Sequence, residues 1–121
     1  LTFANGGMPY PFCVGSNGVT RLELPGLPLG LFADGKYEQT HMAIQPGDLV
    51  VLASDGCTEA EDFRGEPFGD ERVISCIEKH RDEPLDRLVR SLYDEVCRFM
   101  QGNEIRDDIT LLALRRRDSG D

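Results

Sequence analysis

Aspartates stand at the ends of two apolar segments of this sequence. Asp55 follows the apolar run 49–53, whereas Asp107 and Asp108 come directly before a second run, 109–114. A carboxylate at the end of a buried strand must be solvated, capped or paired with a cation. Carboxylates gathered at one place repel each other, so either one stays protonated or a cation neutralises them. An all-oxygen cluster favours a hard ion, Mg²⁺ or Mn²⁺, over Zn²⁺.

Whether these aspartates meet depends on how the two strands pair. If the strands are antiparallel neighbours, the end of one lies beside the start of the other, and Asp55 and Asp107 share one edge of the sheet. If the strands are parallel, the two residues lie roughly 20 Å apart, at ~3.3 Å per residue. A purely structural interpretation stays open here, because Asp-Gly is an ordinary turn dipeptide and Asp is common at strand ends.

The order of the predicted elements favours the antiparallel arrangement. Turn signals rich in Gly, Asn and Pro separate predicted strands at 1–4, 11–14, 19–24, 36–44 and 49–53. Apolar residues at helical spacing predict two helices, one over 70–80 and one that starts at Pro84 and stops at Gly102-Asn103, and a last strand covers 109–114. Strands followed by helices and one final strand are the α+β pattern, in which helices pack on one face of a mainly antiparallel sheet.

Composition limits the classes of function. The chain has 121 residues, 40% of them hydrophobic, and a formal net charge of −9. This size fits one compact domain. An acidic surface argues against nucleic acid or an anionic membrane as the main partner. No apolar stretch approaches the ~20 residues that a membrane-spanning helix needs.

The four cysteines, Cys13, Cys57, Cys76 and Cys97, are widely scattered and form no CxxC pair. This spacing makes a zinc knuckle or a thioredoxin-type motif a poor interpretation. Two disulfides would suit a secreted protein, but no signal-peptide pattern is present. The sequence therefore predicts reduced thiols in a cytoplasmic domain.

Several segments resemble one protein family. Residues 47–60, GDLVVLASDGCTEA, are similar to the "GDxxxxxTDGxxEA" signature of the bacterial stage II sporulation protein E type phosphatases, which belong to the metal-dependent type 2C (PPM) serine/threonine phosphatase superfamily. Four further segments match in order: FANGGMP at 3–9, LPLGL at 27–31, FGDER at 68–72 and RDDITLL at 106–112. Five ordered matches cover nearly the whole chain.

The resemblance implies part of an α-β-β-α sandwich with a dinuclear Mn²⁺ or Mg²⁺ centre. It assigns Asp55 and Asp107 as metal ligands, and Asp108 and Gly56 as supporting residues behind them. Glu59 matches a family position without a ligand role, and we expect it at the N-terminal end of a helix. The implied reaction is hydrolysis of phosphoserine or phosphothreonine by a metal-activated water. Cys57 is expected to be a small buried thiol rather than a nucleophile.

The sequence also departs from the family pattern. Met8 stands where the family usually has His, and Gly6 where it usually has Ala. The family's "GDxxD" and "DxxGHG" segments, which carry its other metal carboxylates, do not occur. Residues 1–115 therefore look like the C-terminal portion of a phosphatase domain followed by a polar tail, 116–121, and we expect this portion alone to be inactive.

The resemblance implies a phosphorylated protein substrate, such as an anti-sigma-factor antagonist, and an upstream sensor domain on the same polypeptide. Two alternatives stay open: a catalytically dead phosphatase-like domain that binds a partner, and a receiver-type signalling domain, which would alternate strands and helices. His41 and His80 lack any site context and are expected at the surface.

Overall fold

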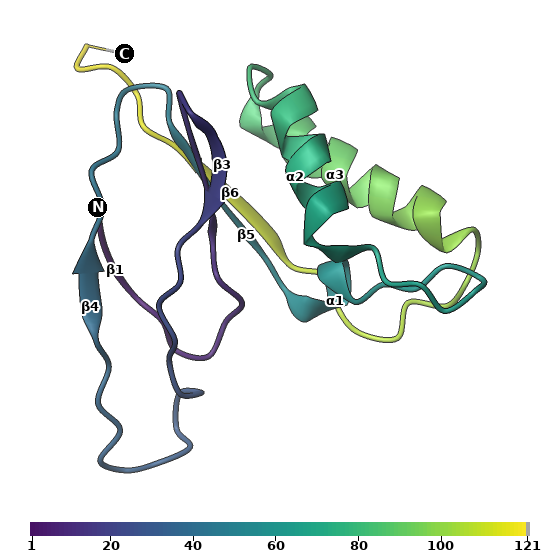
Figure 1. Cartoon of the computed structure of the whole chain (residues 1–121), viewed down its shortest axis with the longest axis horizontal. Helices are drawn as coiled ribbons and strands as arrows, with labels where there is room; N and C mark the ends of the chain where they lie inside the picture. The colour runs from purple at the N-terminus through teal and green to yellow at the C-terminus, as the bar shows by residue number, and fades with distance from the viewer. Residues whose placement is uncertain (121) are drawn as a thin grey trace.

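The computed structural model describes residues 1–120 and has strands in its first half, helices in its second half and a final strand (Figure 1). The elements are β1 (Thr2–Ala4), β2 (Phe12–Gly15), β3 (Gly18–Arg21), β4 (Gln39–His41), β5 (Leu49–Ala53), α1 (Asp55–Thr58), α2 (Gly69–His80), α3 (Leu85–Met100) and β6 (Leu111–Arg115). The predicted α+β class is confirmed. Asp121, the last residue of the predicted polar tail, lies outside the described residues.

The strands form two antiparallel sheets. The larger sheet has the order β3-β2-β5-β6, and β1 pairs with β4 in a separate two-stranded ribbon. β2 and β3 make the predicted hairpin, in which Gly15 pairs with Gly18 across a two-residue turn. Gly18 has φ +105°, a conformation that favours glycine. Strands that are all antiparallel are incompatible with the receiver-type alternative, which needs parallel strands joined through helices.

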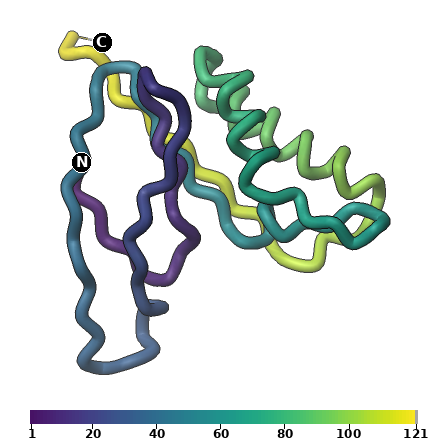
Figure 2. The backbone as a smooth tube through the Cα atoms, viewed as in Figure 1, coloured from purple at the N-terminus to yellow at the C-terminus, as the bar shows by residue number. Residues whose placement is uncertain are grey.

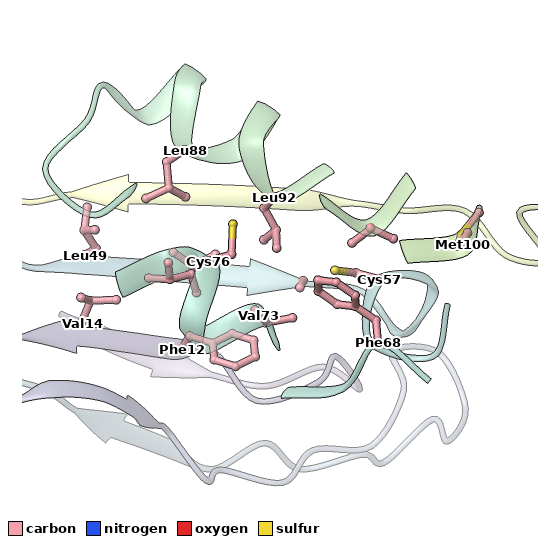
Figure 3. Packing of buried hydrophobic residues seen from close by; sticks show 14 residues of the cluster. Phe12, Val14, Leu49, Cys57, Phe68, Val73, Cys76, Leu88, Leu92 and Met100 are labelled. Atoms are coloured by element: carbon pink, nitrogen blue, oxygen red, sulfur yellow. The ribbon is translucent and has the colours of Figure 1, made fainter. Parts of the chain in front are cut away.

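The helices α2 and α3 cover one face of the larger sheet (Figures 1 and 2). The sheet contributes alternate side chains to the core between these layers, as the two-residue period of a strand requires. α3 contributes one stripe at three- and four-residue steps. Figure 3 shows side chains from the two layers meeting in this core. The sheet contributes Phe12, Val14, Leu49, Val51 and Ala53, and the rest of the cluster is Cys57, Phe68, Val73, Cys76, Ile77, Leu88, Leu92, Val96 and Met100.

The opposite face of the sheet is also apolar. β5 pairs Val50 with Leu114 and Leu52 with Leu112, and these residues point away from the helices. Leu112 and Leu114 are 51% and 47% exposed, although Val50 is buried. This second apolar face explains why β5 is a continuous apolar run instead of alternating with polar residues.

Several boundaries differ from the prediction. The strand expected over 36–44 is regular only at Gln39–His41, where it pairs with β1. β6 starts two residues later than expected and runs to Arg115. The one-turn helix α1 was not predicted, because four residues are too few to show a helical period. Glu59 is the C-cap of α1, so its expected place at the N-terminal end of a helix is wrong.

The two histidines also differ in environment. His41 is exposed, as predicted, and its ring Nδ1 lies 3.0 Å from the Thr2 hydroxyl. His80 was expected at the surface, but its side chain is only 15% exposed and lies beside Glu83 and Glu95. The last turn of α2 faces α3 at this position, which the sequence pattern does not reveal.

The four cysteines are unpaired, in accord with the prediction.

Asn5 organises the turn that follows β1. It is 4% exposed, and its side-chain nitrogen donates hydrogen bonds to the carbonyls of Met8 (2.8 Å) and Leu24 (2.9 Å). Its side-chain oxygen accepts from the backbone N–H groups of Gly7 (2.9 Å) and Met8 (2.8 Å). One buried amide therefore satisfies four backbone groups and ties the turn to the chain after β3.

None of the helices within residues 1–120 has both the length and the hydropathy of a membrane span.

We predict that Asn5→Ala lowers the free energy of unfolding by about 1–3 kcal/mol, because it leaves buried backbone groups without partners. The matched control is Asn17→Ala, since Asn17 is exposed in the β2–β3 turn. Urea denaturation of the protein measures the free energy of unfolding of both variants. Equal effects of the two substitutions would contradict the role given to Asn5.

Candidate metal centre

The register of β5 and β6 brings Asp55 and Asp107 to the same edge of the sheet. Ala53 pairs with Leu111 in the last regular step of the antiparallel ladder. Ser54 then extends the pairing: its N–H donates to the Thr110 carbonyl at 2.9 Å, and its hydroxyl accepts from the Thr110 N–H at 2.9 Å. The same hydroxyl lies 3.2 Å from the Asp108 carbonyl, to which it donates. The antiparallel arrangement predicted from the order of elements is thus the one observed.

Gly56 allows the two aspartate-bearing segments to touch. A Cβ atom on Gly56 would lie 2.2 Å from the Asp108 carbonyl oxygen and 3.1 Å from that of Asp107. No side chain fits in that space, so only glycine permits this approach of α1 to the 107–108 backbone. The missing side chain of Gly56 therefore lets α1 lie against the 107–108 backbone.

The carboxylates themselves face solvent. Asp55 is exposed at the first position of α1, and its side chain forms no hydrogen bond or ion pair with any residue from 1 to 120. Asp107 is also exposed, and one of its carboxylate oxygens accepts from the Asp108 N–H at 2.8 Å. This bond orients the Asp107 carboxylate and leaves its second oxygen available. Asp108, which is likewise exposed, contributes its backbone to the contact with Gly56.

A cleft of about 710 Å³ adjoins Gly56 and Asp107. Its acidic lining residues are Glu59, Glu61, Asp62, Glu104 and Asp107. Arg106 also lines it and forms an ion pair with Glu61 at 3.0 Å. Asp55 is not among the lining residues. Glu61, Asp62 and Glu104 are not predicted from the sequence as part of this cleft, because they lie outside regular helices and strands, where a local excess of acidic residues is the only signal.

Cys57 lies next to this edge but belongs to the core. It is fully buried, and burial raises the pKa of its thiol to about 11. The thiol therefore stays protonated at neutral pH and is a poor nucleophile. The prediction of a small buried thiol is confirmed.

The donor atoms fit a hard divalent cation better than a soft one. Asp55 and Asp107 offer carboxylate oxygens only, and Mg²⁺ and Mn²⁺ prefer such ligands. Two carboxylates are fewer than the six ligands of an octahedral site. The remaining ligands of such a site would have to be groups other than these two carboxylates, such as water.

The family model of Stage II sporulation protein E (SpoIIE) matches residues 1–117, and the chain belongs to this family. Phosphoserine phosphatase RsbU of Bacillus subtilis is 35% identical over 97 residues, which cover 79% of this chain and 28% of that protein. Protein IcfG of Synechocystis sp. is 27% identical over 120 residues, which cover 96% of this chain and 18% of that protein. The chain thus spans only a minor part of either relative.

Solved structures show the same fold. The SiaA-PP2C domain of Pseudomonas aeruginosa has a TM-score of 0.75 at 23% identity, covering 93% of this chain and 44% of that one. The Mn-presoaked phosphatase domain of SpoIIE from Bacillus subtilis has a TM-score of 0.65 at 18% identity, covering 97% of this chain and 50% of that one. The chain therefore has the fold of part of a PP2C phosphatase domain.

We predict that Gly56→Ala separates α1 from the 107–108 backbone and lowers the free energy of unfolding by about 1–3 kcal/mol, the usual cost of overpacking. The control is Gly15→Ala, whose added Cβ would meet its nearest neighbour, an Asp48 carboxylate oxygen, at an ordinary 3.8 Å. Denaturation curves of both variants provide the comparison. A Gly56→Ala variant as stable as Gly15→Ala would show that the close approach is not needed.

Proposed function

We propose that the polypeptide carrying this chain is a metal-dependent protein serine/threonine phosphatase. In this proposal Asp55 and Asp107 are ligands of a Mn²⁺ or Mg²⁺ pair, and Asp108 and Gly56 hold them in place. The observation that supports it most directly is the β5–β6 register, which brings both aspartates to one sheet edge, where Gly56 contacts the 107–108 backbone. Membership of the SpoIIE family supports the reaction class.

The residues of this chain would bind the metal ions and would orient the carboxylates that hold them. Asp55 and Asp107 would each offer an unpaired carboxylate oxygen, and the Asp108 N–H would keep the Asp107 carboxylate in one rotamer. When bound, a metal pair of this kind lowers the pKa of a water nucleophile and neutralises charge on phosphoryl oxygens. Hydrolysis then breaks the bond between phosphorus and the serine or threonine oxygen. Cys57 takes no part, because its protonated thiol is buried.

The proposed substrate is a phosphorylated regulatory protein, such as an anti-sigma-factor antagonist. Support comes from the relative that is named a phosphoserine phosphatase and shares 35% identity with this chain. A sensor or regulatory domain on the same polypeptide is part of the proposal. The proposal also includes a cytoplasmic location, which the four unpaired thiols support.

We predict that Asp55→Asn and Asp107→Asn, tested in the full-length polypeptide, each weaken Mn²⁺ binding by more than about 100-fold, because a lost ligand costs more than a lost supporting residue. Phosphatase activity should fall in parallel. Calorimetric titration with Mn²⁺ and a phosphopeptide assay measure the two effects. Asp94→Asn, an exposed acidic position on α3, is the control and should change neither.

This experiment also tests the alternative of a catalytically dead, partner-binding domain. A dead scaffold would bind no Mn²⁺ in its unsubstituted form. Unaltered Mn²⁺ affinity in both substituted proteins would instead show that Asp55 and Asp107 are not metal ligands.

A second proposal concerns the chain in isolation. Because it offers two carboxylates and exposes Leu112 and Leu114 on the uncovered face of the sheet, we expect residues 1–121 alone to show little or no turnover with excess Mn²⁺. The comparison is turnover of the full-length polypeptide under the same conditions. Equal turnover numbers for the two would refute this expectation.

A further inference from the structure

Three potential metal ligands of different chemistry meet between α2 and α3. Cys76 and His80 are four residues apart on α2, so they lie on the same face of that helix. Glu95 comes from α3, and one ligand atom from each of the three residues lies within 4.8 Å of the other two. Cys76 is 1% exposed, and Figure 3 shows its sulfur directed from α2 toward the α3 side of the core.

The His80 ring has an orientation that is common among metal-binding histidines, with one ring nitrogen beside a carboxylate. Its Nδ1 lies 3.1 Å from a Glu83 carboxylate oxygen, and its Nε2 lies 3.9 Å from a Glu95 carboxylate oxygen. In the tautomer that carries its proton on Nδ1, the ring would donate to Glu83 and would present the Nε2 lone pair to the cluster. Histidines that bind zinc commonly donate their second N–H to a carboxylate in this way.

The segment that carries Glu83 is fixed to the sheet. The Arg115 guanidinium, on β6, donates to the carbonyls of Arg81 (2.6 Å) and Glu83 (2.8 Å). The Arg81 guanidinium donates to the Gly15 carbonyl at 3.1 Å. Glu83, the partner of His80, therefore lies on a loop that is hydrogen-bonded to the sheet. The orientation of the His80 ring is established without a bound ion.

We propose that Cys76, His80 and Glu95 form a binding site for a borderline-soft divalent transition ion, with Zn²⁺ the best match, separate from the centre at Asp55 and Asp107. One thiolate, one imidazole nitrogen and one carboxylate oxygen are typical Zn²⁺ ligands, whereas Mg²⁺ and Mn²⁺ favour oxygen alone. The three side chains leave a fourth tetrahedral position for water. The ion would clamp α2 to α3.

Charge balance is satisfied by a divalent ion. A Cys76 thiolate and a Glu95 carboxylate would together neutralise a divalent cation inside this poorly solvated interface. Because a bound thiol coordinates as the thiolate, metal binding would release the Cys76 proton to solvent.

The test uses the reduced full-length polypeptide, with the oxygen-only centre first saturated with Mg²⁺. Co²⁺ is then added as a spectroscopic substitute for Zn²⁺. We expect a near-ultraviolet sulfur-to-cobalt charge-transfer band at one ion per chain, which Zn²⁺ abolishes and Mn²⁺ does not. Absence of this band would overturn the proposal.

Variants locate the site. Cys76→Ser and His80→Gln should lose the band, and Glu83→Gln should weaken Zn²⁺ binding by about 10- to 100-fold. His80→Gln is the safer substitution for folding, because its side chain is partly exposed, and circular dichroism checks each variant. Cys97→Ser, which removes a thiol of α3 outside the cluster, should keep the band.

Asp55→Asn separates this proposal from the phosphatase proposal. It should keep the cobalt band while Mn²⁺ binding is lost. A band that persists in both Cys76→Ser and His80→Gln, or that disappears in Asp55→Asn, would refute a separate site between α2 and α3.

Discussion

The antiparallel pairing of β5 with β6 is the interaction on which the candidate metal centre depends. It joins residues more than fifty positions apart in sequence, and the Ser54 hydroxyl carries the pairing past the end of the regular ladder to the 108–110 backbone. The chain then turns into α1, where Gly56 packs directly on the second aspartate segment. A shift of one residue in this register would turn every β5 side chain to the other face and separate the two carboxylates.

The helix layer keeps that pairing in place. α2 and α3 bury one face of β5, and the core between the layers includes Cys57 and Phe68, which flank the segment after Asp55. The other face stays apolar and partly uncovered at Leu112 and Leu114. An apolar sheet face of this kind is stable when another layer covers it. This agrees with a chain that covers about half of the solved phosphatase domains that share its fold.

The two proposed cation sites lie on different elements of the fold. The sheet edge presents exposed carboxylate oxygens on short segments, which would suit a hard ion that keeps several waters. The α2–α3 interface presents sulfur, nitrogen and oxygen in a poorly solvated position, which suits a softer ion with few ligands. Because the ligand sets differ, each site would discriminate against the ion that the other prefers.

The sequence by itself determined the order of elements, the α+β class and the family, and it predicted Asp55 and Asp107 as the metal ligands that we propose. Apolar periodicity and turn residues are local, and the antiparallel pairing follows from the grouping of strands before helices. Only the tertiary structure placed His80 beside Glu95, showed Glu59 at the end of α1 instead of the start of a helix, and gave Gly56 its role. These features depend on contacts between backbone and side chains far apart in sequence, and no local spacing encodes them.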